Sequence, residues 1–292
     1  MSGPTSANAD DDPRGLVSTA WLAERLGTGG DLRVLDATWL MPALGRDARR
    51  EHVEAHIPGA VYFDIDRIAD TGSPLPHMLP SADKFAAEVG ALGVGDGEQV
   101  VVYDGNNYSA SARVWWMFRA FGHDRVAVLD GGLARWRAEG RPVETGLVAP
   151  RQRRFVARPR PDLVRDLPAV RANLDSRREQ VIDARARGRF EGTAPEPRPG
   201  LRPGHIPGSL NLPYTDLIDP ADGTLLDPDR IRERLAAAGI DPGRPAATTC
   251  GSGVTACVVS LALHRIGRDD VPVYDGSWTE WGGRPDTPVE TG

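Results

Sequence analysis

The second half of the chain repeats the order of short motifs in the first half at a nearly constant distance. The residues His-Ile-Pro-Gly at 56–59 recur at 205–208, an offset of 149. Val-Leu-Asp-Gly at 128–131 returns as Val-Tyr-Asp-Gly at 273–276, an offset of 145. Solenoid repeats have much shorter periods of about 20 to 50 residues. The 292-residue chain is therefore expected to contain two copies of one domain of ordinary size.

Each copy alternates short apolar runs with longer segments of helical periodicity. Continuous apolar runs at 99–103 and 125–129 are typical of buried strands. Ser18 and Ser81 are predicted to be helix N-caps. Such alternation predicts an α/β fold in which each domain is a parallel sheet with helices on both faces. Helices are expected over 16–26, 81–92 and 109–121.

Composition divides the chain into four segments. Residues 1–13 are polar and acidic, as in a disordered tail rather than a signal peptide. Five arginines and three prolines between 150 and 161 indicate a stiff connection that holds the two halves close. The expected organisation is a tail at 1–13, a first domain without a catalytic cysteine at 14–145, a linker at 146–166 and a catalytic domain at 167–292.

Charge and cysteine usage argue against several classes of function. A net charge of −6 argues against nucleic acid as a partner, and no apolar run of about 18 residues is present to cross a membrane. Two cysteines, Cys250 and Cys257, are too few for a disulfide framework and fit a reducing cytoplasm. Their spacing matches no usual zinc site, so neither a metal nor a cofactor is expected.

One cysteine stands where a short strand gives way to a helix. Cys250 follows an expected strand at 244–249 and precedes an expected helix at 254–266, which places it at the crevice where open α/β sheets bind ligands. The flanking glycines let backbone N–H groups converge on one point, and the helix N-terminus adds positive charge. This loop is predicted to stabilise a Cys250 thiolate; the alternative is a buried structural cysteine. The predicted cradle residues are Gly251, Gly253, Val254 and Thr255.

The first copy has no such nucleophile. Its equivalent position is Asp104, directly after the expected strand at 99–103. One domain is therefore predicted to react and the other to shape or cover the site. Simpler roles are expected for several other repeated residues: turn fixing for His56 and His205, turn capping for Asp130 and Asp275, and inert packing for Cys257.

Several motifs resemble those of the tandem-domain sulfurtransferases of the rhodanese family. They are Cys-Gly-Ser-Gly-Val-Thr-Ala at 250–256, the two His-Ile-Pro-Gly segments and Asp-Gly-Ser-Trp at 275–278. The resemblance covers nearly the whole chain and implies two rhodanese-like domains. This form of the cysteine loop is similar to that of relatives that use 3-mercaptopyruvate. Relatives that prefer thiosulfate carry a basic pair after the cysteine, where this chain has Gly251 and Ser252.

The resemblance also implies roles for further residues. Arg189 and Arg198 would hold the carboxylate and keto oxygen of the donor, and Ser252, His77 and Asp66 would form a proton relay. The implied reaction transfers sulfur from a small-molecule donor to Cys250, giving a persulfide. The persulfide then passes the sulfur to a thiol such as that of thioredoxin, or to cyanide, in a ping-pong scheme.

Three other functions compete with this interpretation. A cysteine-dependent phosphatase needs an arginine six residues after the cysteine, and that position is Ala256. Thiosulfate:cyanide sulfur transfer is a closer alternative, because Arg189 and Arg198 could compensate for the neutral loop. A non-catalytic sulfur-carrier module is the third alternative, and the intact Cys250 argues against a purely structural role.

Overall fold

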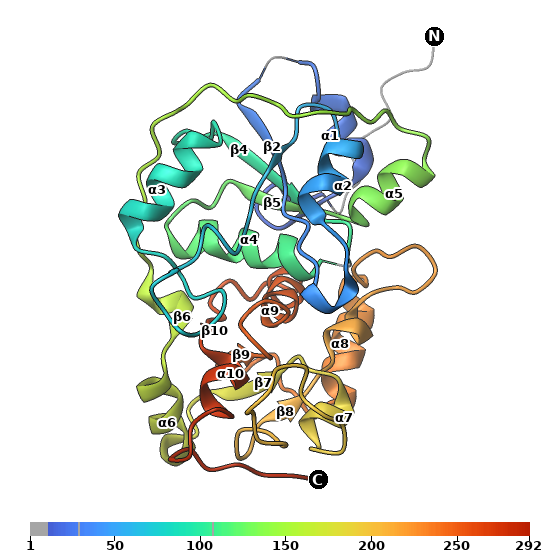
Figure 1. The fold of residues 1–292 in the computed structure, drawn as a ribbon. Coiled ribbons are helices and arrows are strands. Elements are labelled where there is room, and N and C mark those ends of the chain that lie inside the picture. Colours follow the sequence, from blue (N-terminus) through green and yellow to red (C-terminus); the bar gives the residue numbers. More distant parts are fainter. Residues whose placement is uncertain (1–10, 29, 107) are drawn as a thin grey trace.

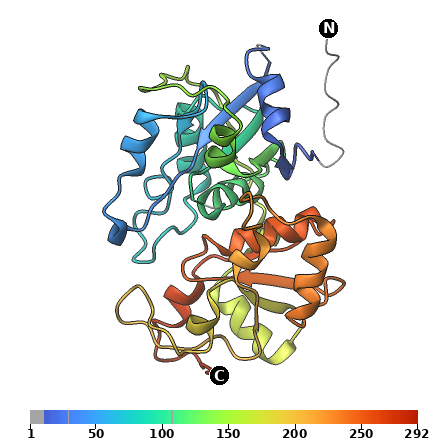
Figure 2. The ribbon, with the colours of Figure 1, turned by 90° about the vertical axis from the view of Figure 1, so that its right-hand side faces the viewer.

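The computed structural model describes residues 11–292 except 29 and 107, and these form two stacked α/β domains (Figures 1 and 2). Each domain contains a five-stranded sheet in which every strand pairing is parallel. The strand order is β1-β5-β4-β2-β3 in the first sheet and β6-β10-β9-β7-β8 in the second. The two orders are the same when the strands of each domain are counted along the chain. The two-copy architecture expected from the repeat is confirmed.

The first domain contains the elements β1 (Leu16–Val17), α1 (Thr19–Arg25), β2 (Leu32–Asp36), η1 (Pro42–Leu44), α2 (Ala48–Glu54), β3 (Val61–Tyr62), α3 (Ala82–Ala91), β4 (Gln99–Tyr103), α4 (Ser109–Ala120), β5 (Val126–Leu129) and α5 (Gly132–Ala138). The second domain contains η2 (Pro161–Leu163), β6 (Val164–Arg165), α6 (Leu167–Ser176), β7 (Gln180–Asp183), α7 (Arg187–Phe190), β8 (Leu210–Asn211), η3 (Tyr214–Leu217), α8 (Pro228–Ala237), β9 (Ala246–Thr249), α9 (Ala256–Arg265), β10 (Val273–Tyr274) and α10 (Ser277–Trp281).

The central strand β4 shows why each sheet has helices on both faces. All five of its residues are buried. Val100 and Val102 belong to one apolar cluster, which also takes in residues of α3 and α4, whereas Val101 and Tyr103 belong to another, which takes in residues of α1 and α5. Successive strand residues point to opposite faces, so a continuous apolar run requires a helical layer on each side.

The two domains share one apolar core through helices α4 and α9, which pack against each other between the sheets (Figure 1). Every residue of α4 is buried, and so are the nine residues 256–264 of α9. Burial on every side means that each of these helices is covered by other parts of the protein all round. The largest apolar cluster accordingly joins residues of both domains.

The domains exchange one contact twice, in a reciprocal way. A carboxylate oxygen of Asp130, at the end of β5, accepts a hydrogen bond of 3.0 Å from the backbone N–H of Leu225. Asp275, at the end of β10, accepts one of 2.7 Å from the N–H of Leu79. Asp130 is the repeat equivalent of Asp275, and Leu79 is that of Leu225. The domain interface therefore has approximate twofold symmetry. The two aspartates were predicted to cap their own turns; the hydrogen bonds of the described residues instead direct their carboxylates across the domain interface.

Two boundaries differ from those expected. Residues 16–17 form the edge strand β1, which pairs with β5, so the first helix begins at Thr19 with Ser18 as its N-cap. Ser81 also caps its helix as predicted. The expected linker at 146–166 is too long, because 164–165 form strand β6, which pairs with β10.

The remaining linker is attached to the first domain. Phe155 is buried there, with its ring centroid 5.7 Å from that of Phe85 and 5.9 Å from that of Phe118. The backbone N–H of Arg158 donates to the carbonyl of Phe121 at 2.8 Å. The connection is therefore held by packing and backbone hydrogen bonds, in addition to the stiffness that its prolines provide.

Residues 1–10 of the predicted tail lie outside the described residues. Its last part is ordered by contacts with both domains, which corrects the expected extent of disorder. Asp11 accepts a hydrogen bond of 2.6 Å from the backbone N–H of Ser18, and Asp12 lies 3.0 Å from Nε2 of His264. In the described part of the chain, no helix is both long and apolar enough to cross a membrane.

Candidate active site

Cys250 lies between β9 and α9 at the floor of a cavity of about 420 Å³. The cavity is formed by both domains: Trp39 and Met41 of the first and Arg189 and Arg198 of the second are among the residues that line it. Only 1 % of the Cys250 surface is exposed to solvent. The thiol is thus buried in the protein and yet borders a cavity that could hold a small molecule.

Cys257 has a different environment. It is fully buried, does not line this cavity, and its Sγ lies 3.3 Å from the carbonyl oxygen of Gly253. Burial raises the pKa of the Cys257 thiol far above its usual range. Both thiols are shielded from solvent, and they differ in that Cys250 borders the cavity whereas Cys257 does not.

The cysteine loop is fixed by bonds to the start of α10. The carbonyl of Cys250 accepts from the N–H of Trp278 at 2.9 Å, and that of Gly251 accepts from the N–H of Thr279 at 2.8 Å. Gly253 has a φ of +74°, and a Cβ there would lie 2.7 Å from the carbonyl oxygen of Asp275. A residue with a side chain would be strained at this position and would also clash.

Backbone amides in this loop have no protein acceptor. Among the described residues, the N–H groups of Ser252, Val254 and Ala256 donate to none. Buried N–H groups are rarely left without a partner, so they are available to an anion in the cavity or on Cys250. Of the predicted cradle residues Gly251, Gly253, Val254 and Thr255, Val254 is one of these three, and the cradle itself stays a prediction.

The equivalent loop of the first domain holds an anion of its own. Asp104 stands where Cys250 stands in the second domain, and its carboxylate accepts from four backbone N–H groups at 2.8–3.1 Å. Burial raises the pKa of the Asp104 carboxyl, and these hydrogen bonds oppose that rise. The donors are the amides of Asn106, Tyr108, Ala110 and Ser111, the first three of which are equivalent to Ser252, Val254 and Ala256.

The cavity contains one guanidinium without a counter-charge. Among the described residues, no carboxylate lies within 4.0 Å of Arg198, whereas Arg189 lies 2.7 Å from the Glu196 carboxylate. Burial lowers the pKa of Arg198; negative charge on Cys250 opposes this shift and the positive charge of Arg189 adds to it. Arg198 is therefore the better placed of the two predicted arginines to bind a substrate carboxylate.

Glu196 was missed as a site residue by sequence reasoning. Its side chain is 4 % exposed, and it also pairs with the buried Arg185 at 2.8 Å. Arg185 in turn pairs with Asp183 at 2.7 Å and stacks over the ring of Trp278. Arg185 is thus fully occupied by neighbours, which separates it from Arg189. A buried carboxylate in a proline-rich loop carries no sequence signal by itself.

The predicted relay residues come from a loop of the first domain. His77 is buried, has a φ of +61°, and its Nδ1 lies 3.0 Å from Oδ1 of Asp66. Trp39 donates to the other Asp66 oxygen at 2.8 Å. The contact with His77, together with this bond, holds the pKa of Asp66 below its usual value against the effect of burial.

The third member of the relay is not joined to the other two. Ser252 lines the cavity, but among the described residues no hydrogen bond links its hydroxyl to His77. Nε2 of His77 is buried and has no hydrogen-bond partner among the described residues. The geometry therefore shows the Asp66–His77 contact, and the step from His77 to Ser252 stays a prediction.

A buried ion pair between the domains was also missed. Arg113 of α4 lies 2.7 Å from Oδ1 of Asp275, and it donates to the carbonyl of Gly253 at 3.1 Å and to that of His77. The pair of charges holds the pKa of Arg113 above its usual value, although burial acts in the opposite direction. The available signal was an arginine directly before the apolar run 114–118 of the expected helix at 109–121.

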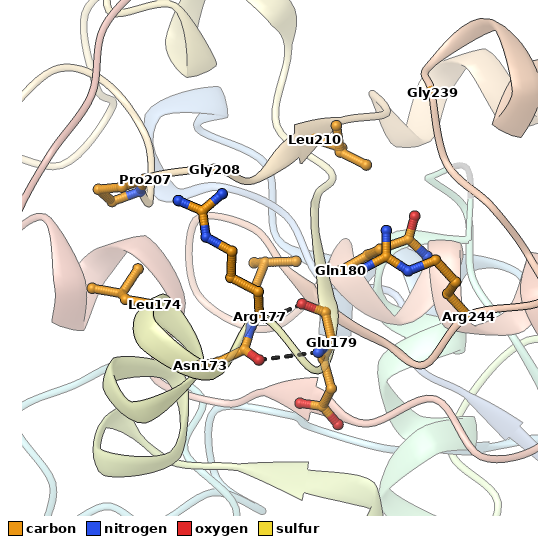
Figure 3. Close-up of a pocket in the computed structure, with 11 residues that line it drawn as sticks. Asn173, Leu174, Arg177, Glu179, Gln180, Pro207, Gly208, Leu210, Gly239 and Arg244 are labelled. Carbon is orange, nitrogen blue, oxygen red and sulfur yellow. Dashed lines mark hydrogen bonds between the residues drawn. The ribbon is translucent and has the colours of Figure 1, made fainter.

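Another pocket, of about 270 Å³, lies at the opposite end of the second sheet, where β7 begins at Gln180 (Figure 3). Hydrogen bonds of 2.8 and 3.0 Å join Asn173 to the backbone of Glu179 at its edge. The residues that line it include neither a cysteine nor a histidine. In the described part of the chain, no cluster of three or more His, Cys, Asp or Glu residues could hold a metal ion.

Comparison with known proteins agrees with the geometry. The rhodanese-like domain family matches residues 18–139 and 166–284. The chain is 50 % identical over 274 residues to human 3-mercaptopyruvate sulfurtransferase, covering 92 % of each protein. It is 46 % identical over 287 residues to bovine thiosulfate sulfurtransferase, covering 96 % of each. The crystal structure of SseA from Escherichia coli, a 3-mercaptopyruvate enzyme, is similar with a TM-score of 0.82 and 38 % identity over 90 % of this chain and 98 % of that one.

Proposed function

The chain belongs to the rhodanese family and is a sulfurtransferase, and from this premise we propose that it transfers sulfur from 3-mercaptopyruvate through a Cys250 persulfide. The products are pyruvate and a sulfur-loaded acceptor, which we propose to be a thiol, such as that of thioredoxin, or cyanide. The observation that carries the proposal is the position of Cys250, beside free amides and the unpaired Arg198 in one cavity.

Sulfur transfer begins with attack of the Cys250 thiolate on the sulfur of the donor. A sulfur–sulfur bond forms, the donor carbon–sulfur bond breaks, and the electron pair stays on carbon as the pyruvate enolate. The proton lost from the donor thiol ends on that carbon, giving pyruvate and an anionic persulfide. His77 and Asp66, with Ser252 as the proposed third member, supply a route for this proton. Acceptor attack on the outer sulfur returns Cys250 to the thiolate.

The charges in the cavity favour a monoanionic donor. Arg198 can bind one carboxylate, whereas Glu196 already neutralises Arg189. Thiosulfate carries two negative charges and would face a neutral loop at Gly251 and Ser252. Thiosulfate:cyanide sulfur transfer remains the second candidate, since relatives such as the bovine enzyme are named for it.

Sulfur transfer to cyanide tests the proposal when the two donors are compared at equal concentrations. We expect a higher kcat/KM with 3-mercaptopyruvate than with thiosulfate, and a large preference for thiosulfate would contradict the proposed substrate. Mass spectrometry after incubation with donor alone should find one added sulfur atom on the peptide that contains Cys250. Cys250→Ser should abolish both signals, and full turnover by this variant would contradict the mechanism.

A reducing compartment such as the cytoplasm fits the two free cysteines and is the location we propose. One plant relative, 44 % identical, carries a mitochondrial designation in its name. Fractionation of the native host cells would decide between a cytoplasmic and an organellar location.

A further inference from the structure

The reciprocal contact between the domains differs on its two sides in one respect. On the side away from the cavity, Asp130 is contacted by the hydroxyl of Tyr108 and the N–H of Leu225. On the cavity side, Asp275 is contacted by the guanidinium of Arg113 and the N–H of Leu79. The uncharged hydroxyl of Tyr108 thus contacts the carboxylate of Asp130, whereas the cationic guanidinium of Arg113 contacts that of Asp275.

Arg113 makes further contacts that Tyr108 does not make on the other side of the interface. Arg113 reaches the carbonyl of Gly253 in the cysteine loop and the carbonyl of His77 in the relay loop. Its guanidinium also lies over the ring of Trp116, 4.5 Å from the ring centroid. One rigid group therefore touches the segments that carry the nucleophile and the proposed proton donor.

Joining the domains does not by itself require an arginine at this position. Among the described residues no cation lies within 4.0 Å of Asp130 on the pseudo-equivalent side, where the charge pair that spans the domains, Arg135 with Asp222 at 2.8 Å, is exposed rather than buried. The repeat equivalent of Arg113 is the buried Val259. Placing a guanidinium and a carboxylate in the interior carries a large desolvation cost. Because the pseudo-equivalent side is docked without a buried ion pair, the buried pair of Arg113 with Asp275 is expected to serve a further purpose.

We infer that Arg113 is a positioning residue for sulfur transfer, which fixes the distance between the cysteine loop of the second domain and the His77 segment of the first. Asp275 completes the arrangement, because its second oxygen accepts from Leu79, two residues after His77. The inference rests on the proposed function, in which His77 and the Cys250 loop act on the same donor molecule. Arg113 itself does not line the cavity, so it acts through the residues it holds.

The test compares variants on the two sides of the interface. Arg113→Met alone would leave Asp275 as a buried, unpaired charge, so the main variant is Arg113→Met with Asp275→Asn. Arg113→Lys keeps the charge with a different shape. Tyr108→Phe, on the far side, is the matched control that removes one buried polar contact. For each protein, kcat and KM are measured per reactive Cys250, titrated with iodoacetamide.

The double variant should lose about 10- to 100-fold in kcat per reactive Cys250, because small misplacements of reacting groups are costly. Its KM should stay within about threefold of wild type, since Arg198 is unchanged. Arg113→Lys should recover part of the loss, and Tyr108→Phe should lower the Tm and keep kcat. A folded double variant with normal kcat, or an equal loss of kcat in Tyr108→Phe, would overturn the inference.

Failure of the proposed function would look different from failure of this inference. If wild type does not use 3-mercaptopyruvate, the proposed substrate is wrong, and the same variants are then compared with thiosulfate as donor. The positioning role predicts the same order of variants with either donor. Equal kcat in all variants with the donor that wild type uses would contradict it.

Discussion

Asp104 and Cys250 occupy equivalent positions in the two domains, and the loop around Asp104 donates four backbone hydrogen bonds to its carboxylate. The same chain therefore contains two versions of one loop, one with a buried carboxyl group and one with a thiol. The first version shows what this backbone can bind. The same local geometry predicts that the second version also binds an anion.

Cys250→Asp should fold and lose all sulfur transfer. Its carboxylate is expected to accept from the amides of Ser252, Val254 and Ala256, as that of Asp104 does from their equivalents. Calorimetry should give a Tm no lower than that of Cys250→Ala, and a clearly lower Tm would contradict the equivalence of the loops.

In the reverse test, Asp104→Ala leaves four amides without an acceptor and should reduce the free energy of unfolding by about 3 kcal/mol or more.

Removal of either cavity arginine should weaken donor binding, but for different reasons. Arg198→Ala removes the unpaired cation and should raise the KM for 3-mercaptopyruvate by about 10-fold or more, since hydrogen bonds between charged groups contribute about 1.5–3 kcal/mol. Arg189→Ala also exposes the donor to the charge of Glu196. Arg189→Ala with Glu196→Gln should therefore bind the donor better than Arg189→Ala alone. An unchanged KM in Arg198→Ala would remove this residue from the site.

Gly253→Ala should destabilise the protein more than Gly208→Ala does. The φ angle is +74° at Gly253 and +73° at Gly208. Both substitutions therefore cause the strain of a left-handed backbone, about 1–2 kcal/mol. Only at Gly253 would the new Cβ approach the Asp275 carbonyl (2.7 Å) and the Arg113 guanidinium (3.0 Å). Urea unfolding measures both costs, and sulfur transfer should fall in Gly253→Ala alone. Equal destabilisation would show that the loop can relax around the added methyl group.

The Asp66–His77 contact should contribute stability only above the acidic range. The pKa of Asp66 lies below its ordinary value of 3.8 in the folded protein. A carboxyl with a lowered pKa stabilises the fold above its unfolded pKa, and this contribution is lost as the pH falls through the folded pKa. Because the Asp66 side chain is 62 % exposed, the difference between wild type and Asp66→Asn should be below about 1 kcal/mol at pH 7. Urea unfolding at neutral and acidic pH should show the difference shrinking, and growth of the difference in acid would contradict the assignment.

Local and repeated features of the fold were predictable from the sequence. Ser18 and Ser81 cap helices because a hydroxyl before a helical segment satisfies its free N–H groups. The position of Cys250 followed from the boundary between a short buried strand and an apolar helix. Strands β1 and β6 were missed because two residues are too short to show a pattern.

Contacts between distant segments were not predictable. Arg113 and Gly253 are 140 positions apart, and Leu79 and Asp275 are 196 apart. Only the packing of α4 on α9 brings these residues together. The pairing of Glu196 with Arg189 depends likewise on the path of an irregular loop. The sequence therefore predicted the nucleophile, its loop and the cavity arginines, but not the carboxylate of Glu196 or the pair of Arg113 with Asp275.

The buried Phe155 helps to keep the two walls of the cavity together at low protein concentration. A cleft formed between separate subunits comes apart when the protein is scarce. Here both walls belong to one chain, and the linker between the domains is anchored in the first domain by the ring of Phe155. The second wall is thus tethered at a high effective concentration, whatever the amount of protein in solution.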